Sequence, residues 1–546
     1  MRKLIWAPYI CIVSGLFAAE AAFFLDDLSP WRRCAALFWI IGSSVILLSA
    51  WATAFAPFLE REFWALPHRA WYLMAFFLPP FLVLLNAGGT YFTHVDGEGL
   101  DQLAGGIKLI RYDPSLGIFR LSYFSYPARQ FVLNSLPSYF FGPSLWAARL
   151  GNSMLYIGSY LFFLSALASY LRSRRTPDPL LFASYCGVMI ALAQYTLLNA
   201  RKFEQTTMPI AVTLFFLGAL LLFLVNPGPL RFLWVTWSFG FFPSCYTPAL
   251  GTWVLALGAL VYLIGWKHRR ILIVTVAYGI ACVYVAYRVV KTDDAGSIPY
   301  KFQFGLGHGT VGDWTLRYLH SLRAVIGSDF TLIPAPLALA LFAALYLAWR
   351  YRDYLFAAIC AWAVAIVVVS VTTFGSNLNL PYYDVHRTMI ILPPLALGAV
   401  LLIIRYLTGA GDPSPSAKVL KFMIKLSMVY MVFTGVCTVF LVRSFFGASM
   451  TSDYDEIMAQ IDRVARSPSF ARPARIYLVP PLDVILEPGL RYFAPEAKVL
   501  RSSPPTAEKS PGTYVFSYLS ANPEDRIDEQ RMPSTHMRPF IRMVAE

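Results

Sequence analysis

Charge is scarce in this sequence, and its scarcity is the first guide to the class of protein. Only 14% of the 546 residues are Asp, Glu, Lys or Arg, whereas a soluble globular protein carries about 25%. Hydrophobic residues make up 57% of the chain. This balance excludes an ordinary soluble protein and predicts an all-α polytopic membrane protein.

Cysteine frameworks and the common catalytic motifs are also lacking. The seven cysteines lie mostly inside apolar runs, so they form neither a disulfide framework nor a Cys/His zinc pattern. The chain has no HExxH motif, no P-loop and no Ser/His/Asp order. The glycine-rich stretch FGLGHG at 304–309 lacks the strand–turn–helix context of a phosphate-binding loop.

Long apolar runs dominate what is present. A helix that crosses a bilayer needs about 20 mostly apolar residues. We count about thirteen such runs and predict a transmembrane helix in each: 5–25, 35–56, 71–89, 152–171, 179–199, 205–226, 231–247, 248–265, 270–290, 334–349, 354–374, 388–406 and 422–443.

The net charge of +14 comes mainly from short loops between these runs, which gives no support to nucleic-acid binding. Lys and Arg cluster on one side of the predicted bundle, at 2–3, 172–175, 267–270, 350–352 and 405–425. The positive-inside rule makes that side cytoplasmic. The segments predicted to face outward are 90–151, 199–205, 291–333, 375–387 and the C-terminal part from about 444.

The chain therefore divides into three predicted parts: two N-terminal helices in 1–70, a membrane domain in 71–443, and a polar, proline-rich segment in 444–546. The last part has short runs of β-forming residues, preceded by the helical pattern YDEIMAQIDRVA. We predict a small outward α/β domain whose strands lie at 475–479, 498–500 and 513–518.

The longest polar interval inside the membrane part is 94–152, between an apolar run that ends near Leu85 and one expected to begin at Ser153. It opens with Asp96 and Glu98. Such carboxylates can act as a general base toward a hydroxyl or amine, can bind a divalent cation, or can be ordinary turn residues that cap a helix. Basic residues interleaved with aromatics follow, and three are candidate site residues: Lys108, Arg111 and Arg129.

A second outward segment, LLNARKFEQTT, places Glu204 after Arg201 and Lys202. The three residues are either part of a site or an interfacial charge cluster. Because this segment and the one with Asp96 face the same side, we expect that the two acidic segments can approach each other.

Two more outward segments supply candidates. His386 and Arg387 precede an apolar helix in LPYYDVHRTMIILPP. A guanidinium there suits a phosphate, although it can also snorkel to lipid headgroups. His320 lies in the cationic and aromatic segment 291–333, which fits a lipid phosphate and a sugar or plain adhesion to headgroups.

Several motifs together resemble the GT-C membrane glycosyltransferases, such as the lipid A aminoarabinose transferases and the protein O-mannosyltransferases. An acidic motif follows an apolar helix, and an outward stretch then leads into a helix through Pro137–Tyr139, Phe141–Gly142, Ser144 and Ala147–Leu150. NARKFEQTTMPIAVTLFFLGALLL and PYYDVHRTMIILPPLALGAVLLI are similar to later parts of that family. The resemblance covers about 71–406 in pattern.

The resemblance implies transfer of a sugar from a polyprenyl-phosphate donor to a lipid, glycan or protein acceptor on the outer face, usually with inversion. It implies that Asp96 is the general base and that Glu98 or Glu204 supports the acceptor or a metal. Arg201 and Arg387 would neutralise the leaving phosphate, and we add Lys202 and His386 to this group. Gly97 separates two acids that are adjacent in many members. A divalent Mg, Mn, Ca or Zn ion is left open.

The alternative is a protein that is not an enzyme: a transporter or flippase of lipid-linked glycans, or a structural subunit of an envelope complex. Transporters often show internal repeats and mid-membrane charges. We find no convincing repeat, and ionisable residues gather at the outer ends of the runs. This pattern favours chemistry at the surface, and so an enzyme, over a translocation path. The charge pattern and shortness of the loops favour a bacterial inner membrane with a periplasmic site, and an enzyme of the endoplasmic reticulum would have the same topology.

Overall fold

The computed structural model describes most of the membrane part and short pieces of the C-terminal part. The described residues are 7–25, 32–85, 87, 100, 103–107, 110, 129–201, 207–245, 249–293, 333–374, 389–409, 415–445, 461–462, 465–466, 475–478, 489–490, 492–494, 498–500, 513–518 and 539–543.

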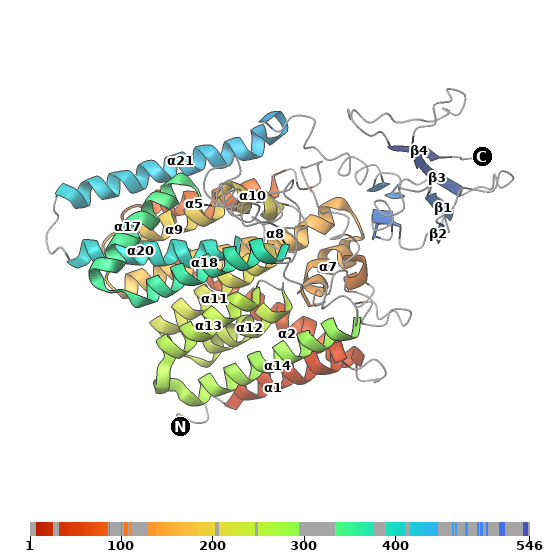
Figure 1. The fold of residues 1–546 in the computed structure, drawn as a ribbon, viewed down its shortest axis with the longest axis horizontal. Coiled ribbons are helices and arrows are strands. Elements are labelled where there is room, and N and C mark those ends of the chain that lie inside the picture. The colour runs from red at the N-terminus through yellow and green to blue at the C-terminus, as the bar shows by residue number, and fades with distance from the viewer. Residues whose placement is uncertain are drawn as a thin grey trace.

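The described membrane part is a bundle of helices (Figure 1). Its elements in chain order are α1 (Ala7–Leu25), α2 (Arg32–Thr53), α3 (Ala56–Leu59), α4 (Arg61–Ala65), α5 (Arg69–Leu84), α7 (Arg129–Phe141), α8 (Leu145–Ser173), α9 (Pro179–Ala191), α10 (Gln194–Arg201), α11 (Thr207–Val225), α12 (Pro229–Phe241), η4 (Phe242–Ser244), α13 (Ala249–Ile264), η5 (Gly265–His268), α14 (Arg269–Asp293), α17 (Ala335–Tyr351), α18 (Tyr354–Phe374), η7 (Met389–Ile391), α20 (Leu392–Gly409) and α21 (Pro415–Phe445).

Length and composition identify the chain as an integral membrane protein. Among the described residues, five helices are long and apolar enough to cross a membrane, namely α2, α8, α11, α14 and α21. The count is six if α9 and α10 form one broken span, since they meet at an angle of 67°. The polytopic membrane fold is confirmed, while the number of thirteen spans stays a prediction.

Helix α8 is the central helix of the bundle. It has 29 residues, and 83% of its most apolar stretch is buried inside the protein. Small residues allow neighbouring helices to approach it closely. A Cβ added at Gly158 would lie 2.2 Å from the Trp51 ring of α2. One added at Gly151 would lie 2.0 Å from the carbonyl oxygen of Asn134 in α7.

Two predicted boundaries need correction. Helix α8 begins at Leu145 rather than at Ser153, because Ser144 provides a local N-cap that the polar residues around it obscure. The run 179–199 is not one straight helix, because the chain bends between α9 and α10.

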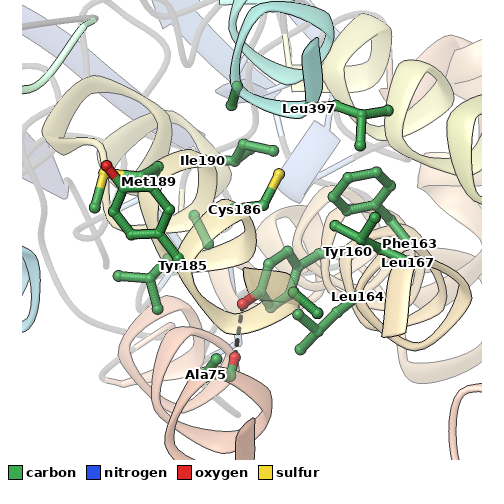
Figure 2. Close-up of a cluster of buried hydrophobic side chains, with 14 of the residues drawn as sticks. Ala75, Tyr160, Phe163, Leu164, Leu167, Tyr185, Cys186, Met189, Ile190 and Leu397 are labelled. Atoms are coloured by element: carbon green, nitrogen blue, oxygen red, sulfur yellow. Dashed lines mark hydrogen bonds between the residues drawn. The ribbon is translucent and has the colours of Figure 1, made fainter. Parts of the chain in front are cut away.

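Helix α5 contains two consecutive prolines, and α8 compensates for one of them. Pro79 has no N–H, so the carbonyl of Ala75 cannot make its ordinary helical hydrogen bond. The hydroxyl of Tyr160 donates to that carbonyl at 2.6 Å. Figure 2 shows this bond at the edge of an apolar cluster formed by α5, α8, α9 and α20. The buried hydroxyl and the freed carbonyl satisfy each other.

The first two helices are integrated into the bundle. The hydroxyl of Tyr9 in α1 lies 2.7 Å from Thr236 Oγ1 of α12 and 2.9 Å from Thr275 Oγ1 of α14. In α12, Trp237 donates its ring N–H to Ser43 of α2 at 3.1 Å. Buried hydroxyls and indoles thus join residues 7–53 to the later helices.

The described strands of the C-terminal part form one mixed sheet beyond the end of the bundle near α7 (Figure 1). Its order is β2 (Lys498–Leu500), β1 (Arg475–Leu478), β3 (Thr513–Tyr518) and β4 (Pro539–Met543). β1 pairs in parallel with β2 and β3, and β4 pairs antiparallel with β3. Three strands lie in the segments with β-forming sequence, and β4 was not expected.

Candidate functional site at the start of α8

The site begins with the N-terminus of α8. Ser144 is extended, with φ −157° and ψ 159°, and its hydroxyl oxygen accepts a hydrogen bond from the backbone N–H of Ala147 at 3.0 Å. This cap satisfies one of the four free N–H groups at the helix start. The N-terminus of a helix is its positive end, and Arg149 lies one turn into α8. The charge pattern of the sequence predicts that this end faces outward.

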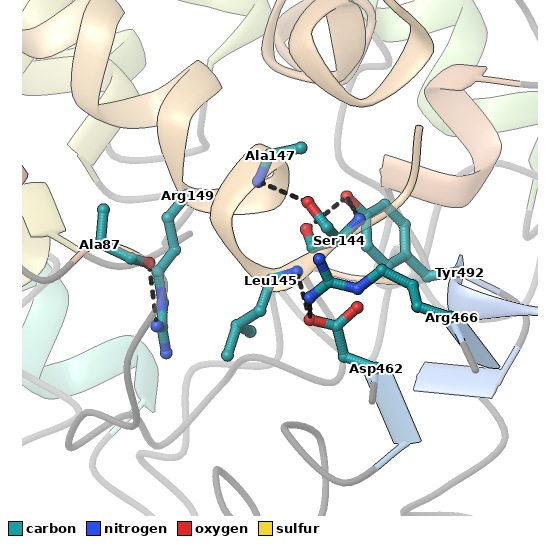
Figure 3. Close-up of polar contacts among 8 residues, drawn as sticks. All are labelled: Ala87, Ser144, Leu145, Ala147, Arg149, Asp462, Arg466 and Tyr492. Atoms are coloured by element: carbon teal, nitrogen blue, oxygen red, sulfur yellow. Dashed lines mark hydrogen bonds and ion pairs between the residues drawn. The ribbon is translucent and has the colours of Figure 1, made fainter. Parts of the chain in front are cut away.

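Residues far along the chain complete the cap (Figure 3). The carboxylate of Asp462 accepts a hydrogen bond from the N–H of Leu145 at 3.2 Å and pairs with Arg466. The hydroxyl of Tyr492 donates to the carbonyl of Ser144 at 3.1 Å and lies 2.6 Å from Ser138 Oγ of α7. The C-terminal part is thereby attached to the end of α7 and the start of α8. We call Ser144, Asp462, Arg466 and Tyr492 the cap cluster.

Burial controls the titration of the cap cluster. It raises the pKa of the Asp462 carboxyl, while the hydrogen bond from Arg466 and that from Leu145 N–H oppose the rise. It also raises the pKa of Tyr492 well above its ordinary value, so this hydroxyl stays a hydrogen-bond donor at neutral pH. Asp462 is therefore easier to protonate than an exposed aspartate.

Two buried guanidinium groups bind the outer end of α5. Arg201, the last residue of α10, donates to the carbonyls of Leu82 at 3.0 Å and Leu85 at 2.8 Å. Arg149 of α8 donates to the carbonyl of Ala87 at 3.2 Å. The last carbonyls of a helix have no partner within it and carry partial negative charge, which makes them suited to cations.

The ends of α5 and α10 and the first part of α8 meet here. The ends of α5 and α10 lie together because Arg201 bridges them, and Ser153 of α8 donates to the carbonyl of Ala200 at 2.8 Å. The chain leaves α5 toward Asp96 and leaves α10 toward Glu204. The two acidic segments thus start from adjacent points, while the approach of the carboxylates themselves stays a prediction.

Most of the predicted site residues lie outside the described residues. These are Asp96, Glu98, Lys108, Arg111, Lys202, Glu204, His320, His386 and Arg387. Arg129 begins α7, and its side chain is not among those described. Arg201 is the predicted residue that the described part places at the site, with an exposed fraction of 4%.

Sequence reasoning missed Arg149, Asp462 and Tyr492. Arg149 has an exposed fraction of 1%. The feature that could have indicated it is a basic residue in the passage AARL, which the structure places in the buried helix α8. Asp462 and Tyr492 contact residues more than 300 positions away, and no local pattern announces such contacts. Asn134 is also fully buried, and neither amide atom has a hydrogen-bond partner among the described residues.

The described residues contain no group of three or more His, Cys, Asp or Glu that could hold a metal ion. The carboxylates proposed as metal ligands, Asp96, Glu98 and Glu204, lie outside this part of the chain. A metal site built from them stays a prediction.

The arrangement of the helices is shared with two solved structures of ArnT, and this shared fold agrees with the fold that the motifs indicate. The structure is similar to that of ArnT from Cupriavidus metallidurans in the apo state, with a TM-score of 0.50 and 14% identity over 86% of this chain and 97% of ArnT. ArnT bound to undecaprenyl phosphate matches with a TM-score of 0.50 and 14% identity over 88% of this chain and 100% of ArnT.

An oligosaccharyltransferase from Archaeoglobus fulgidus also matches, with a TM-score of 0.44 and 13% identity over 79% of this chain and 64% of that one. No family model matches the chain, and no curated protein matches it in sequence. The likeness is therefore one of fold.

Proposed function

We propose that this protein is a glycosyltransferase that moves a sugar from a polyprenyl-phosphate donor to an acceptor on the outer face of the membrane. The observation that carries the proposal is the shared fold with ArnT over almost the whole of both chains. One of the matching ArnT structures holds undecaprenyl phosphate. A lipid-linked donor suits an outward site, because nucleotide sugars are cytoplasmic.

The proposed reaction needs one base and one cationic group. An acceptor hydroxyl or amine attacks the anomeric carbon, and its proton passes to Asp96 as general base. The bond from that carbon to the phosphate oxygen breaks with inversion, and polyprenyl phosphate leaves. Arg201, Lys202, His386 and Arg387 are proposed to stabilise the charge that develops on the phosphate.

Arg201 fits this role in part. Its guanidinium is buried at the end of α5 and donates to the carbonyls of Leu82 and Leu85. We propose that Arg201 both fixes the end of α5 and contributes positive potential toward the leaving phosphate. Glu98 and Glu204 are proposed to bind the acceptor or a divalent Mg, Mn, Ca or Zn ion.

The proposal includes the remaining features of the predicted architecture. We infer about thirteen membrane spans, two of them in residues 1–70, and a C-terminal α/β domain on the outer side. The sheet of β1–β4 and the cap cluster support this placement of the C-terminal domain. We propose a bacterial inner membrane with the site on the periplasmic side, and a lipid, glycan or protein acceptor.

A donor screen tests the proposal. Purified protein is mixed with radiolabelled polyprenyl-phosphate sugars and envelope lipid extract, with and without EDTA. Transfer of label to an acceptor with release of polyprenyl phosphate is expected, and sensitivity to EDTA reports a metal. A folded protein that transfers no sugar and yet moves a lipid-linked glycan across a vesicle membrane supports the flippase alternative instead.

A further inference from the structure

A groove lies between α13 and α14. Its volume is about 460 Å³. Its lining comes from Val261 of α13, Gly265 of the η5 turn, and a row on α14: Arg269, Leu272, Ile273, Val276, Ala277 and Ile280. The row follows helical spacing, so these side chains share one face of α14. Figure 1 shows α14 at the edge of the bundle beside α1.

The groove is open to the surroundings of the bundle. The exposed fractions of Val261, Ile273 and Ile280 are 52%, 65% and 56%. Only 33% of the most apolar stretch of α14 is buried inside the protein. In an integral membrane protein, such apolar side chains face hydrocarbon. At the η5 end, Gly265 adopts φ +53° and a Cβ there would meet nothing within 4 Å, which leaves that end of the groove open.

The length of the groove matches one leaflet. From Arg269 to Ile280 there are eleven steps of helix, which is about 16 Å at 1.5 Å per residue. Half of the hydrocarbon core of a bilayer is about 15 Å. Arg269 therefore lies at headgroup depth when the apolar row lies in the acyl region. This is the end that the charge pattern predicts to be cytoplasmic.

We propose that this groove binds an anionic phospholipid, with one acyl chain along α14 and the phosphate at Arg269. A chain of hydrocarbon suits the lining, in which Arg269 is the one polar side chain among the eight described residues. An extended peptide is disfavoured, because its backbone N–H and C=O groups would find almost no partners there. The positive guanidinium selects an anionic headgroup over a zwitterionic one.

The chain offers a matched control for the headgroup contact. Arg269 and Arg270 are adjacent and both exposed, but Arg269 lines the groove and Arg270 does not. The experiment is native mass spectrometry of the full chain titrated with phosphatidylglycerol or phosphatidylcholine. Arg269→Gln is expected to lower phosphatidylglycerol affinity about fivefold and to leave phosphatidylcholine binding unchanged. Arg270→Gln is expected to change neither.

A second variant tests the apolar part. Ala277→Phe adds a ring to an exposed groove position, so it should expel both lipids while the protein remains folded. Equal losses in Arg269→Gln and Arg270→Gln would overturn the proposal in favour of general surface attraction. A dimer peak that Ala277→Phe abolishes, without bound lipid in the wild type, would overturn it in favour of a second copy of the chain. Neither result bears on sugar transfer.

Discussion

At the scale of single residues, several buried polar groups in this protein are paired across helices. Tyr160 satisfies the Ala75 carbonyl that Pro79 leaves free. We expect Tyr160→Phe to destabilise the protein by about 1–3 kcal/mol, because a buried carbonyl loses its partner. Denaturant unfolding in detergent, followed by tryptophan fluorescence, measures the loss.

Pro79→Ala provides the control for this reading. It restores an N–H at position 79, so the helix can satisfy the Ala75 carbonyl without Tyr160. In the double variant Pro79→Ala/Tyr160→Phe, the second substitution should cost clearly less than it does alone. Additive effects in this double-mutant cycle would contradict the proposed pairing.

Protonation of Asp462 should make the stability of the protein depend on pH. Its pKa is raised by burial above 3.8 in the folded chain, so the folded state binds more protons than the unfolded state just above that value. This contribution to stability is present at low pH and is lost as pH rises through the raised pKa. Asp462→Asn keeps an oxygen to accept from Leu145 N–H, and it should reduce the pH dependence.

Thermal unfolding and limited proteolysis of the C-terminal part between pH 4 and pH 7 measure this effect. The expected result is a flatter profile for Asp462→Asn than for the wild type. Glu60→Gln, which changes a carboxylate paired with Arg172 outside the cap cluster, serves as the control. A profile for Asp462→Asn identical to that of the wild type would count against a titrating cap cluster.

At the scale of elements, close contact between α7 and α8 depends on Gly151. A methyl group there would lie 2.0 Å from the carbonyl oxygen of Asn134, so α7 must move. We expect Gly151→Ala to destabilise the protein by about 1–3 kcal/mol. Gly258→Ala in α13 is the matched control, since its Cβ meets nothing within 4 Å and alanine favours a helix. The unfolding midpoint of Gly151→Ala should therefore fall, while that of Gly258→Ala should stay the same or rise. Equal midpoints for the two variants would contradict the close contact at Gly151.

The sequence predicts helices better than it predicts helix ends. Apolar runs of about 20 residues identify the membrane helices because lipid requires satisfied backbones. The start of α8 could not be read this way. Arg149 and Asn152 look like loop residues, yet both are buried in α8. For Arg149 a partner from another segment, the carbonyl of Ala87, accepts a hydrogen bond from the guanidinium. Long-range compensation of this kind has no local signature.

At the scale of the whole molecule, fold and chemistry were predictable to different degrees. Loose motifs in the right order led to the GT-C fold, and the structural likeness to ArnT agrees at only 14% identity. The carboxylates Asp96, Glu98 and Glu204 were inferred from their position beside helix ends. Arg201 joins the ends of α5 and α10, so the segments that lead to Asp96 and Glu204 start from adjacent points. The roles of the three carboxylates remain proposals.

The cap cluster adds a feature that only the three-dimensional structure reveals. Asp462 and Tyr492 bind the start of α8, while Arg149, one turn further on, binds the segment that leads to Asp96. The C-terminal part is therefore connected through α8 to the proposed catalytic loop. Such a connection gives the C-terminal part a physical route by which it can influence the site.

The most direct test of the proposed glycosyltransferase measures donor binding and sugar transfer separately in the wild type, Asp96→Asn and Asp113→Asn. Asp113 is an acid of the same interval with no proposed role. The proposal predicts that Asp96→Asn binds the polyprenyl-phosphate donor normally and loses transfer by about 100-fold or more, the typical contribution of a general base. Asp113→Asn should retain both. Undiminished transfer by folded Asp96→Asn would contradict the assignment of the base.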